Sequence, residues 1–361
     1  MTPELSLLLV AVALALSECA RWVPARGLAL DGPRGRARLR RPGRLAGNRG
    51  GGFVALDPLA APGAAALVTT RPLALDPTAI LIGGAARPYE AIATARARGA
   101  ELVVDGRSTP CASPAEARRL AALVTALVAA PPAARAALLD ADEAARFDLD
   151  ALRRADAALA RHRRAPGVTA AFLAAGLFVA APLLVGRYTL APIVAPLGLG
   201  LLALHLAHLA VVFRARRALD PADRAGRWLD VVKLLVCPPL AIRAPDALSW
   251  HRFDAFDPIA AAAVMASTDD FAAYAIEARR ALRHPRRAVG LDAAAAAVVD
   301  GDRRRRLAAV DRLLEAQGVG EEAAPVFGDP AVVAWCPRCR TGYRRAEGEC
   351  ADCPGVGLAP R

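Results

Sequence analysis

The residues best suited to chemistry are four cysteines near the C-terminus. Cys336 and Cys339 are separated by two residues, ten residues follow, and Cys350 and Cys353 repeat the spacing. A CxxC pair presents two thiolates from one tight turn, and a ten-residue arm can fold back as a hairpin so that both pairs reach one tetrahedral ion. The spacing predicts a Zn²⁺ site, with iron as the runner-up metal.

Such a site is expected to be structural. Four protein sulfurs leave no open coordination position for a water or a substrate, so the ion would support binding to a partner and not catalysis. Metal binding also supplies folding free energy, which explains how a short segment with almost no apolar core can be stable.

Residues 334–358 resemble the zinc-ribbon family, with the four cysteines at its ligand positions. Family members often place glycine after each second ligand, where this chain has Arg340 and Pro354. Because proline has no N–H to donate to a thiolate, we expect the second turn to be more open or more reactive than usual. The resemblance implies structural Zn²⁺ and a binding role for residues 330–361. We find no family resemblance in the rest of the chain.

His205 and His208 form a second candidate site. They lie three residues apart, and hence on one helical face, within an uncharged stretch that we expect to span a membrane. Ionisable residues at such a depth mark metal sites and proton relays. No Asp or Glu occurs in either helix of the expected hairpin, so two neutral histidines that are hydrogen-bonded within the bundle or reach the interface are the simpler interpretation. The alternative function that follows from this pair is a membrane enzyme or a transporter component.

Two further motifs carry weaker signals. His251 and Asp254 could form an acid–base pair, but a loop before a helix often carries such residues for capping. Gly50 to Gly52 lack the Lys-Ser/Thr that follows in a phosphate-binding loop, which indicates a turn. The chain contains no HExxH, GxSxG or Walker sequence. We therefore assign no catalytic or cofactor-binding residue, and a non-enzymatic role is favoured.

The composition of the 361 residues favours a membrane protein. Hydrophobic residues make up 55% of the chain and the mean hydropathy is +0.30, which is high for a soluble protein. The formal charge is +12, yet Lys233 is the only lysine and the arginines are scattered through every segment. This scatter disfavours nucleic acid as the main partner. The composition instead indicates a GC-rich genome, and we expect a bacterial source.

Two long uncharged stretches predict a transmembrane helical hairpin over residues 165–215. Residues 167–185 carry no charge, and at ~1.5 Å per residue a helix of this length nearly crosses a ~30 Å hydrocarbon core. Residues 190–213 form the second stretch. The short connection at 186–189 requires the two helices to be antiparallel neighbours.

The arginines around the apolar segments predict the orientation. Three lie within 161–164 and three within 214–217, whereas the connection between the helices carries only Arg187. Residues 1–23 predict an uncleaved membrane anchor, because no Lys or Arg precedes the apolar run, and Glu18 argues against lipidation of Cys19. We expect a multi-pass protein of the inner membrane with its N-terminus outside and its main domains and zinc ribbon in the cytosol.

Residues 24–164 predict a small cytosolic α+β domain. Gly and Pro divide its first part into short apolar runs that are typical of strands. Ser113 to Glu116 combine an N-cap, a first-position proline and a capping glutamate, so a helix is expected from there to about residue 129. Another helix is expected over 148–164. The predicted strands lie at 27–30, 53–56, 66–68, 80–82 and 102–104.

Residues 216–325 predict an interfacial and cytosolic helical region. Trp228 to Ile242 is too short and too charged to span a bilayer, which favours an interfacial or buried helix with the tryptophan at headgroup depth. Asp257 and Pro258 mark a capped helix start, and an alanine-rich helical region follows to about residue 317. We expect Arg303 to Arg306 on its solvated face.

These elements define the expected fold class. It is a multi-domain integral membrane protein with an N-terminal anchor, a small cytosolic α+β domain, a transmembrane helical hairpin, an α-helical region and a C-terminal zinc ribbon. The expected role is scaffolding or protein interaction. The expected partners are the lipid bilayer and another protein.

Overall fold

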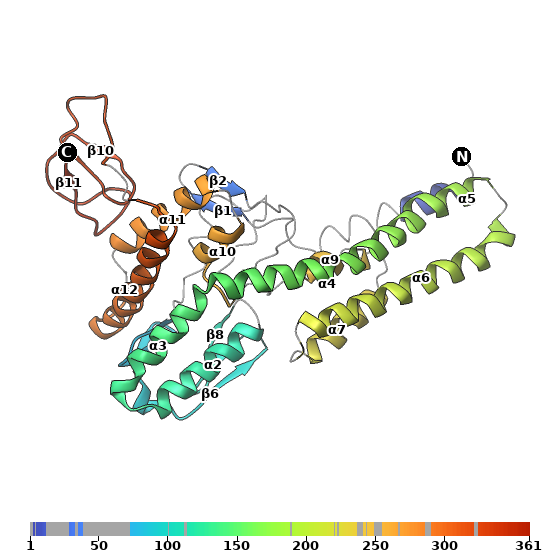
Figure 1. The fold of residues 1–361 in the computed structure, drawn as a ribbon, viewed down its shortest axis with the longest axis horizontal. Coiled ribbons are helices and arrows are strands. Elements are labelled where there is room, and N and C mark those ends of the chain that lie inside the picture. The colour runs from blue at the N-terminus through green and yellow to red at the C-terminus, as the bar shows by residue number, and fades with distance from the viewer. Residues whose placement is uncertain are drawn as a thin grey trace.

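A long helical hairpin extends from a body of helices and small sheets in the computed structural model (Figure 1). Residues 5–11 of the expected anchor are helical. Apart from residue 3, the rest of that segment lies outside the described residues, as do the strands expected at 53–56 and 66–68. The structure describes residues 3, 5–11, 29–32, 35–38, 73–99, 101–111, 114–187, 190–219, 221, 224–236, 241–242, 244–248, 255–265, 268–285, 290–320 and 324–361.

Two antiparallel three-stranded meanders follow each other in the first part of the body. The Gly83-Gly84 and Asp105-Gly106 pairs each close a hairpin with positive φ at both positions, the conformation of a type I′ turn. The strands predicted at 80–82 and 102–104 are confirmed. The meanders contain β3 (Ala74–Leu75), β4 (Ala79–Ile82) and β5 (Ala85–Pro88), then β6 (Ala95–Arg98), β7 (Glu101–Val104) and β8 (Arg107–Pro110), and a separate pair contains β1 (Ala29–Gly32) and β2 (Gly35–Arg38).

Strand β4 is buried on both faces because helices cover its meander from two sides. Ile80 and Ile82 enter a core with helix α2 (Pro114–Ala129), whereas Ala79 and Leu81 pack against helix α12 (Ala293–Ala316). Successive side chains of a strand point to opposite faces, so four consecutive apolar residues suit a strand between two layers. The helix expected up to residue 129 is confirmed as α2.

A second core joins the first half of helix α4 (Leu149–Ala175) to helices α10 (Pro258–Met265), α11 (Thr268–Arg283) and α12. Both expected helix starts are confirmed. Asp148 accepts the backbone N–H groups at the start of α4, and the Asp257 carboxylate accepts the N–H of Ile259 at 2.9 Å at the start of α10. Each cap supplies an acceptor for donors that lack a partner within their own helix.

Helix α3 (Pro132–Arg146) was not predicted. The Pro131-Pro132 pair reads as a break in the sequence, but Pro132 is the first residue of α3. At that position a missing N–H costs nothing and the fixed φ of proline suits the helix.

The prediction of a solvated face for Arg303 to Arg306 is wrong. Arg305 donates to the carbonyl of Leu75 in β3, and Arg306 Nε lies 2.9 Å from a carboxylate oxygen of Asp257. A helix turns once in 3.6 residues, so four consecutive side chains point in every direction and cannot share one face. The run therefore joins α12 to two other elements.

The hairpin is built from two long helical paths. Helix α4 continues without a break into a π-helical turn, η3 (Gly176–Ala180), and helix α5 (Ala181–Arg187), and helix α6 (Leu190–Leu219) returns beside α4 (Figure 1). A β-carbon on Gly176 would come within 2.8 Å of Leu201, so glycine permits this close approach. The helix predicted at 148–164 and the first apolar stretch thus form one continuous element.

Both paths are long and apolar enough to cross a membrane. They span Leu149–Val185 and Ala195–Leu219, and only 17% and 22% of their most apolar windows are buried inside the protein. A core helix of a soluble protein would be mostly buried, whereas these helices expose apolar side chains such as Phe172 and Leu183.

Two smaller segments complete the described elements. Helix α7 (Arg224–Val236) packs along α6, where the rings of Phe213 and Trp228 lie 5.3 Å apart, and helix α9 (Ala244–Ala247) lies against α4. The C-terminal sheet has the order β10-β9-β11 and contains β9 (Ala334–Trp335), β10 (Gly342–Tyr343) and β11 (Ala359–Pro360). The domain boundaries drawn from the sequence stay predictions.

Candidate metal centre

The first CxxC turn is closed by its own backbone. The N–H of Arg340 donates to the carbonyl of Cys336 at 2.8 Å, and the N–H of Cys339 points at Cys336 Sγ at 3.5 Å. Arg340 has φ +64°, the left-handed conformation that glycine adopts most readily. The position at which zinc ribbons often carry glycine therefore needs this conformation here as well.

The second turn takes its left-handed residue one position later, at Gly355 with φ +83°. Val356 closes the turn, because its carbonyl accepts the N–H of Cys350 at 2.9 Å and its N–H donates to the carbonyl of Cys353 at 3.0 Å. Val356 thus closes the turn through backbone groups, and no N–H from Pro354 is available to a thiolate. The expectation that this turn is more open or more reactive stays a prediction.

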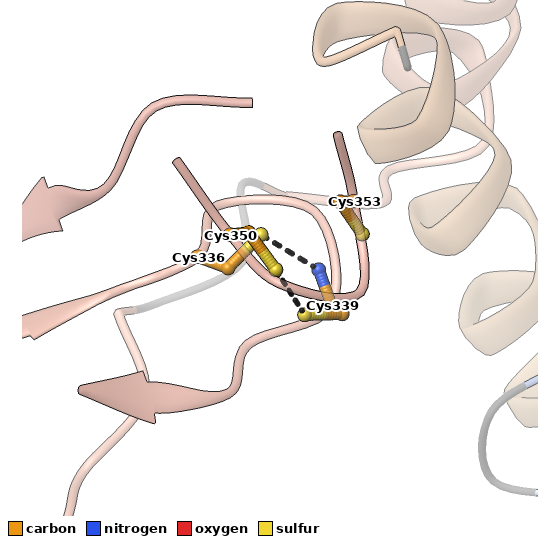
Figure 2. A group of neighbouring side chains, drawn as sticks. All are labelled: Cys336, Cys339, Cys350 and Cys353. Carbon is orange, nitrogen blue, oxygen red and sulfur yellow. Dashed lines mark hydrogen bonds between the residues drawn. The ribbon is translucent and has the colours of Figure 1, made fainter. Parts of the chain in front are cut away.

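The four cysteine side chains lie close together, as predicted (Figure 2). All four sulfurs are within 4.8 Å of one another, and Cys339 Sγ and Cys350 Sγ are 3.5 Å apart. Four sulfurs in a tetrahedron at ~2.3 Å from Zn²⁺ are separated by about 3.8 Å. The donor set and its size therefore fit a metal ion with four thiolate ligands. Cys336, Cys350 and Cys353 are buried, whereas Cys339 is exposed.

Tyr343 supports one of the ligands. Its hydroxyl lies 3.1 Å from Cys350 Sγ and accepts the N–H of Ala351 at 3.1 Å. Burial raises the pKa of the Cys350 thiol, but hydrogen bonds from Tyr343 and the neighbouring thiols outweigh burial and lower the pKa to about 7. Since the thiolate is the form that binds metal, this contact favours a metal ligand at neutral pH. The Tyr343 ring also packs against the cluster formed by the buried cysteines and Val356.

The first CxxC turn also attaches the ribbon to the helical body. The guanidinium of Arg338, between the first two ligands, donates to the carbonyls of Ala281 and His284 at 3.0 and 2.6 Å. In return, Arg280 donates to the carbonyl of Arg338 at 3.3 Å. The last carbonyls of a helix have no partner within the helix, and a guanidinium is a favourable partner for them. Arg338, which contacts the C-terminal end of α11, is thus two residues from Cys336 and one residue from Cys339.

The other ribbon arginines make contacts within the protein. Arg344 pairs with Asp329 at 2.8 Å, and the guanidinium of Arg345 lies over the ring of Tyr343, 5.5 Å from its centroid. With Arg338 attached to α11, three ribbon arginines are engaged within the chain.

His205 and His208 are both buried in the hairpin but have different surroundings. His208 Nδ1 lies 2.7 Å from the hydroxyl of Thr169 on α4, and its Nε2 lies 2.7 Å from the carbonyl of Ala241. Among the described residues, neither ring nitrogen of His205 has a hydrogen-bond partner. His208 is hydrogen-bonded within the hairpin, and the role of the pair stays a prediction.

The sequence did not predict the contacts that the site residues make with residues far away in the chain. Thr169, Ala241 and Arg338 contact residues more than thirty positions away, and no local spacing marks them. His251 and Asp254, and the glycines at 50–52, lie outside the described residues, so their interpretation stays a prediction.

Comparison of the chain with protein-family models, curated proteins and solved structures gave no match.

Proposed function

We propose that this protein is an integral membrane scaffold that presents a structural zinc ribbon for interaction with another protein. The observation that carries the proposal is the cluster of four thiols within 4.8 Å. Four sulfurs complete the tetrahedron of Zn²⁺, so the ion stabilises the ribbon and has no position for a substrate.

Membrane insertion of the hairpin is supported by where its apolar side chains lie. Val168, Phe172, Val179 and Leu183 on the first path are each at least half exposed, as are Leu199 and Leu202 on α6. Large apolar surfaces of this kind are covered by lipid or by another protein. The apolar length of both helices favours lipid, and we infer that the helices span the inner membrane with the ribbon in the cytosol.

A protein-binding role for the ribbon is supported by apolar side chains at its base. Val326 is 95% exposed and Val333 is 44% exposed. Exposed apolar side chains favour contact with a partner, and the metal-stabilised turns hold the adjoining surface in place.

The proposal is tested by metal content per chain on the full-length protein purified in detergent. We expect one zinc per chain, lost in Cys350→Ser and kept in a His205→Ala/His208→Ala double variant. Zinc lost in the histidine variant and kept in the cysteine variant would make the hairpin the metal site and overturn the proposal.

The location is tested with the same chain in cell membranes. We expect the protein to stay in the membrane fraction through alkaline carbonate washes and to require detergent for release. Release by carbonate alone would contradict membrane insertion.

A further inference from the structure

Five exposed arginines surround one end of the hairpin. Arg161 and Arg164 lie on α4, Arg214 and Arg217 on α6, and Arg224 at the start of α7. Within the described part of the chain, none of the five has an acidic partner, in contrast to Arg146, Arg305 and Arg306 in the body. We call these five side chains the arginine girdle.

The pairing of the two helices brings the girdle residues to one level. Thr169 and His208 touch across the hairpin, and so do the positions of Gly176 and Leu201. Counting outward from the Thr169–His208 contact at ~1.5 Å per residue puts the girdle arginines of α4 and α6 roughly 8 to 14 Å beyond it. The four therefore occupy one band at the end of the apolar surface.

Helix α7 adds an aromatic and apolar surface beside this band. Trp228, which contacts Phe213, is 55% exposed, and Val232 and Leu235 are 53% and 47% exposed. Their spacing of four and three residues places all three on one face of α7. Tryptophan beside an apolar stripe, with arginine just beyond it, matches the order of acyl chain, interface and headgroup in a bilayer.

We propose that the arginine girdle is a binding site for anionic phospholipid headgroups, which rests on the membrane insertion proposed above. A guanidinium donates two parallel N–H groups to phosphate oxygens, and a phosphatidylglycerol headgroup keeps the negative charge that phosphatidylcholine neutralises with its own ammonium. The occupant is a lipid and not free phosphate, because the apolar stripe of α7 is placed to contact the acyl chains of the same molecule.

The experiment titrates detergent-purified full-length protein with phosphatidylglycerol or phosphatidylcholine and counts bound lipid by native mass spectrometry. We expect phosphatidylglycerol to bind at least about tenfold more tightly, since each surface arginine adds attraction to anionic lipid. The preference should weaken with added salt, and excess inorganic phosphate should not displace the lipid.

Matched variants separate the girdle from net charge. Changing all five girdle arginines to glutamine should abolish the preference, and changing them to lysine should keep much of it. The control removes the same charge from exposed arginines elsewhere, as Arg96→Gln, Arg98→Gln, Arg107→Gln, Arg118→Gln and Arg312→Gln. The control should bind phosphatidylglycerol like the unaltered protein.

Three outcomes would overturn the site: no preference in the unaltered protein, equal losses in girdle and control variants, or displacement by inorganic phosphate. If the five-glutamine variant fails to fold, Arg214→Gln/Arg217→Gln provides the same comparison with fewer changes. Release of the protein from membranes by carbonate alone would contradict the proposed function. Failure of the lipid site can therefore be told apart from failure of membrane insertion.

Discussion

At the scale of single residues, the contact between Tyr343 and Cys350 is expected to affect the affinity for the metal directly. The hydroxyl orients a ligand without itself binding the metal. Removing such a supporting hydrogen bond commonly lowers metal affinity by about 10- to 100-fold.

We therefore predict that Tyr343→Phe binds zinc about tenfold more weakly while the ribbon still folds. Competition with a chromophoric chelator measures the affinity. Trp335→Phe is the matched control, because the indole N–H donates to the carbonyl of Pro360, away from the sulfurs. Equal losses in the two variants would mean that aromatic packing, and not the hydroxyl, supports the site.

For the two hairpin histidines we predict opposite changes in the free energy of unfolding. His208→Leu should lower the free energy of unfolding by about 1 to 3 kcal/mol, because the carbonyl of Ala241 loses its partner. His205→Leu should raise the free energy of unfolding by about 1 kcal/mol, because an apolar group replaces buried nitrogens that have no hydrogen-bond partner among the described residues.

Thermal unfolding in detergent measures both changes. Loss of stability in His205→Leu comparable with that in His208→Leu would show that the His205 ring binds something in the working protein. That result would favour the alternative function, in which the hairpin histidines bind a metal or transfer protons.

At the scale of elements, Arg338 joins the ribbon to α11. We predict that Arg338→Ala speeds hydrogen exchange of the last turn of α11, because the carbonyls of Ala281 and His284 lose their guanidinium partner. Hydrogen bonds from a charged group contribute about 1.5 to 3 kcal/mol, which corresponds to more than tenfold faster local opening.

Arg344→Ala is the control, since Arg344 pairs with Asp329 and is 76% exposed. It should leave exchange in α11 unchanged. Removal of zinc by a chelator should reproduce the Arg338→Ala result, because the unliganded turn no longer holds Arg338 in place. Unchanged exchange after zinc removal would show that the contact is independent of the metal.

Elements with local signals were predictable, and contacts between distant segments were not. The cysteine spacing, the Asp148 and Asp257 caps and the apolar run of β4 all act within a few residues, so the sequence predicts the ribbon, the helix starts and the strand. Arg306 pairs with Asp257 from 49 positions away, and Arg338 reaches α11 from more than fifty. The helical periodicity of α12 could have shown that Arg303 to Arg306 do not share one face. It could not have identified the residues that these arginines contact.

At the scale of the whole molecule, Asp257 links three helices through buried charge. It caps α10, pairs with Arg306 of α12, and lies 3.6 Å from the guanidinium of Arg146 at the end of α3. Burial raises the pKa of the Asp257 carboxyl, but the charges of Arg306 and Arg146 outweigh burial, so the pKa lies below its ordinary value.

This depressed pKa contributes stability that is present above about pH 4, the pKa of an unfolded Asp, and is lost as the pH falls through the folded value. We predict that Asp257→Asn is less stable by about 3 to 5 kcal/mol at neutral pH, because two arginines lose their counter-ion. Its stability should fall less steeply than that of the unaltered protein below about pH 4.

Denaturant unfolding of the full chain in detergent across that pH range measures both effects. Burial raises the pKa values of nearby Glu143 and Asp302, so these two groups alter the pH dependence above their ordinary pKa values. The carboxyls with lowered pKa values elsewhere, Glu90, Asp105, Asp300 and Asp329, contribute to the acid limb of both proteins alike, so the difference between the two curves reports Asp257. An equal loss of stability with falling pH in the unaltered protein and in Asp257→Asn would contradict the role given to Asp257.

The continuity of α4 has a mechanical consequence. One helix of 27 residues begins in the core of the body and ends in the apolar hairpin, a length of about 40 Å, with Pro166 partway along as the point where a backbone hydrogen bond is missing. With the hairpin inserted as proposed, thinning or thickening of the bilayer would change the tilt of the apolar half of α4, and the same helix would carry part of that rotation past Pro166 into the core that contains α11.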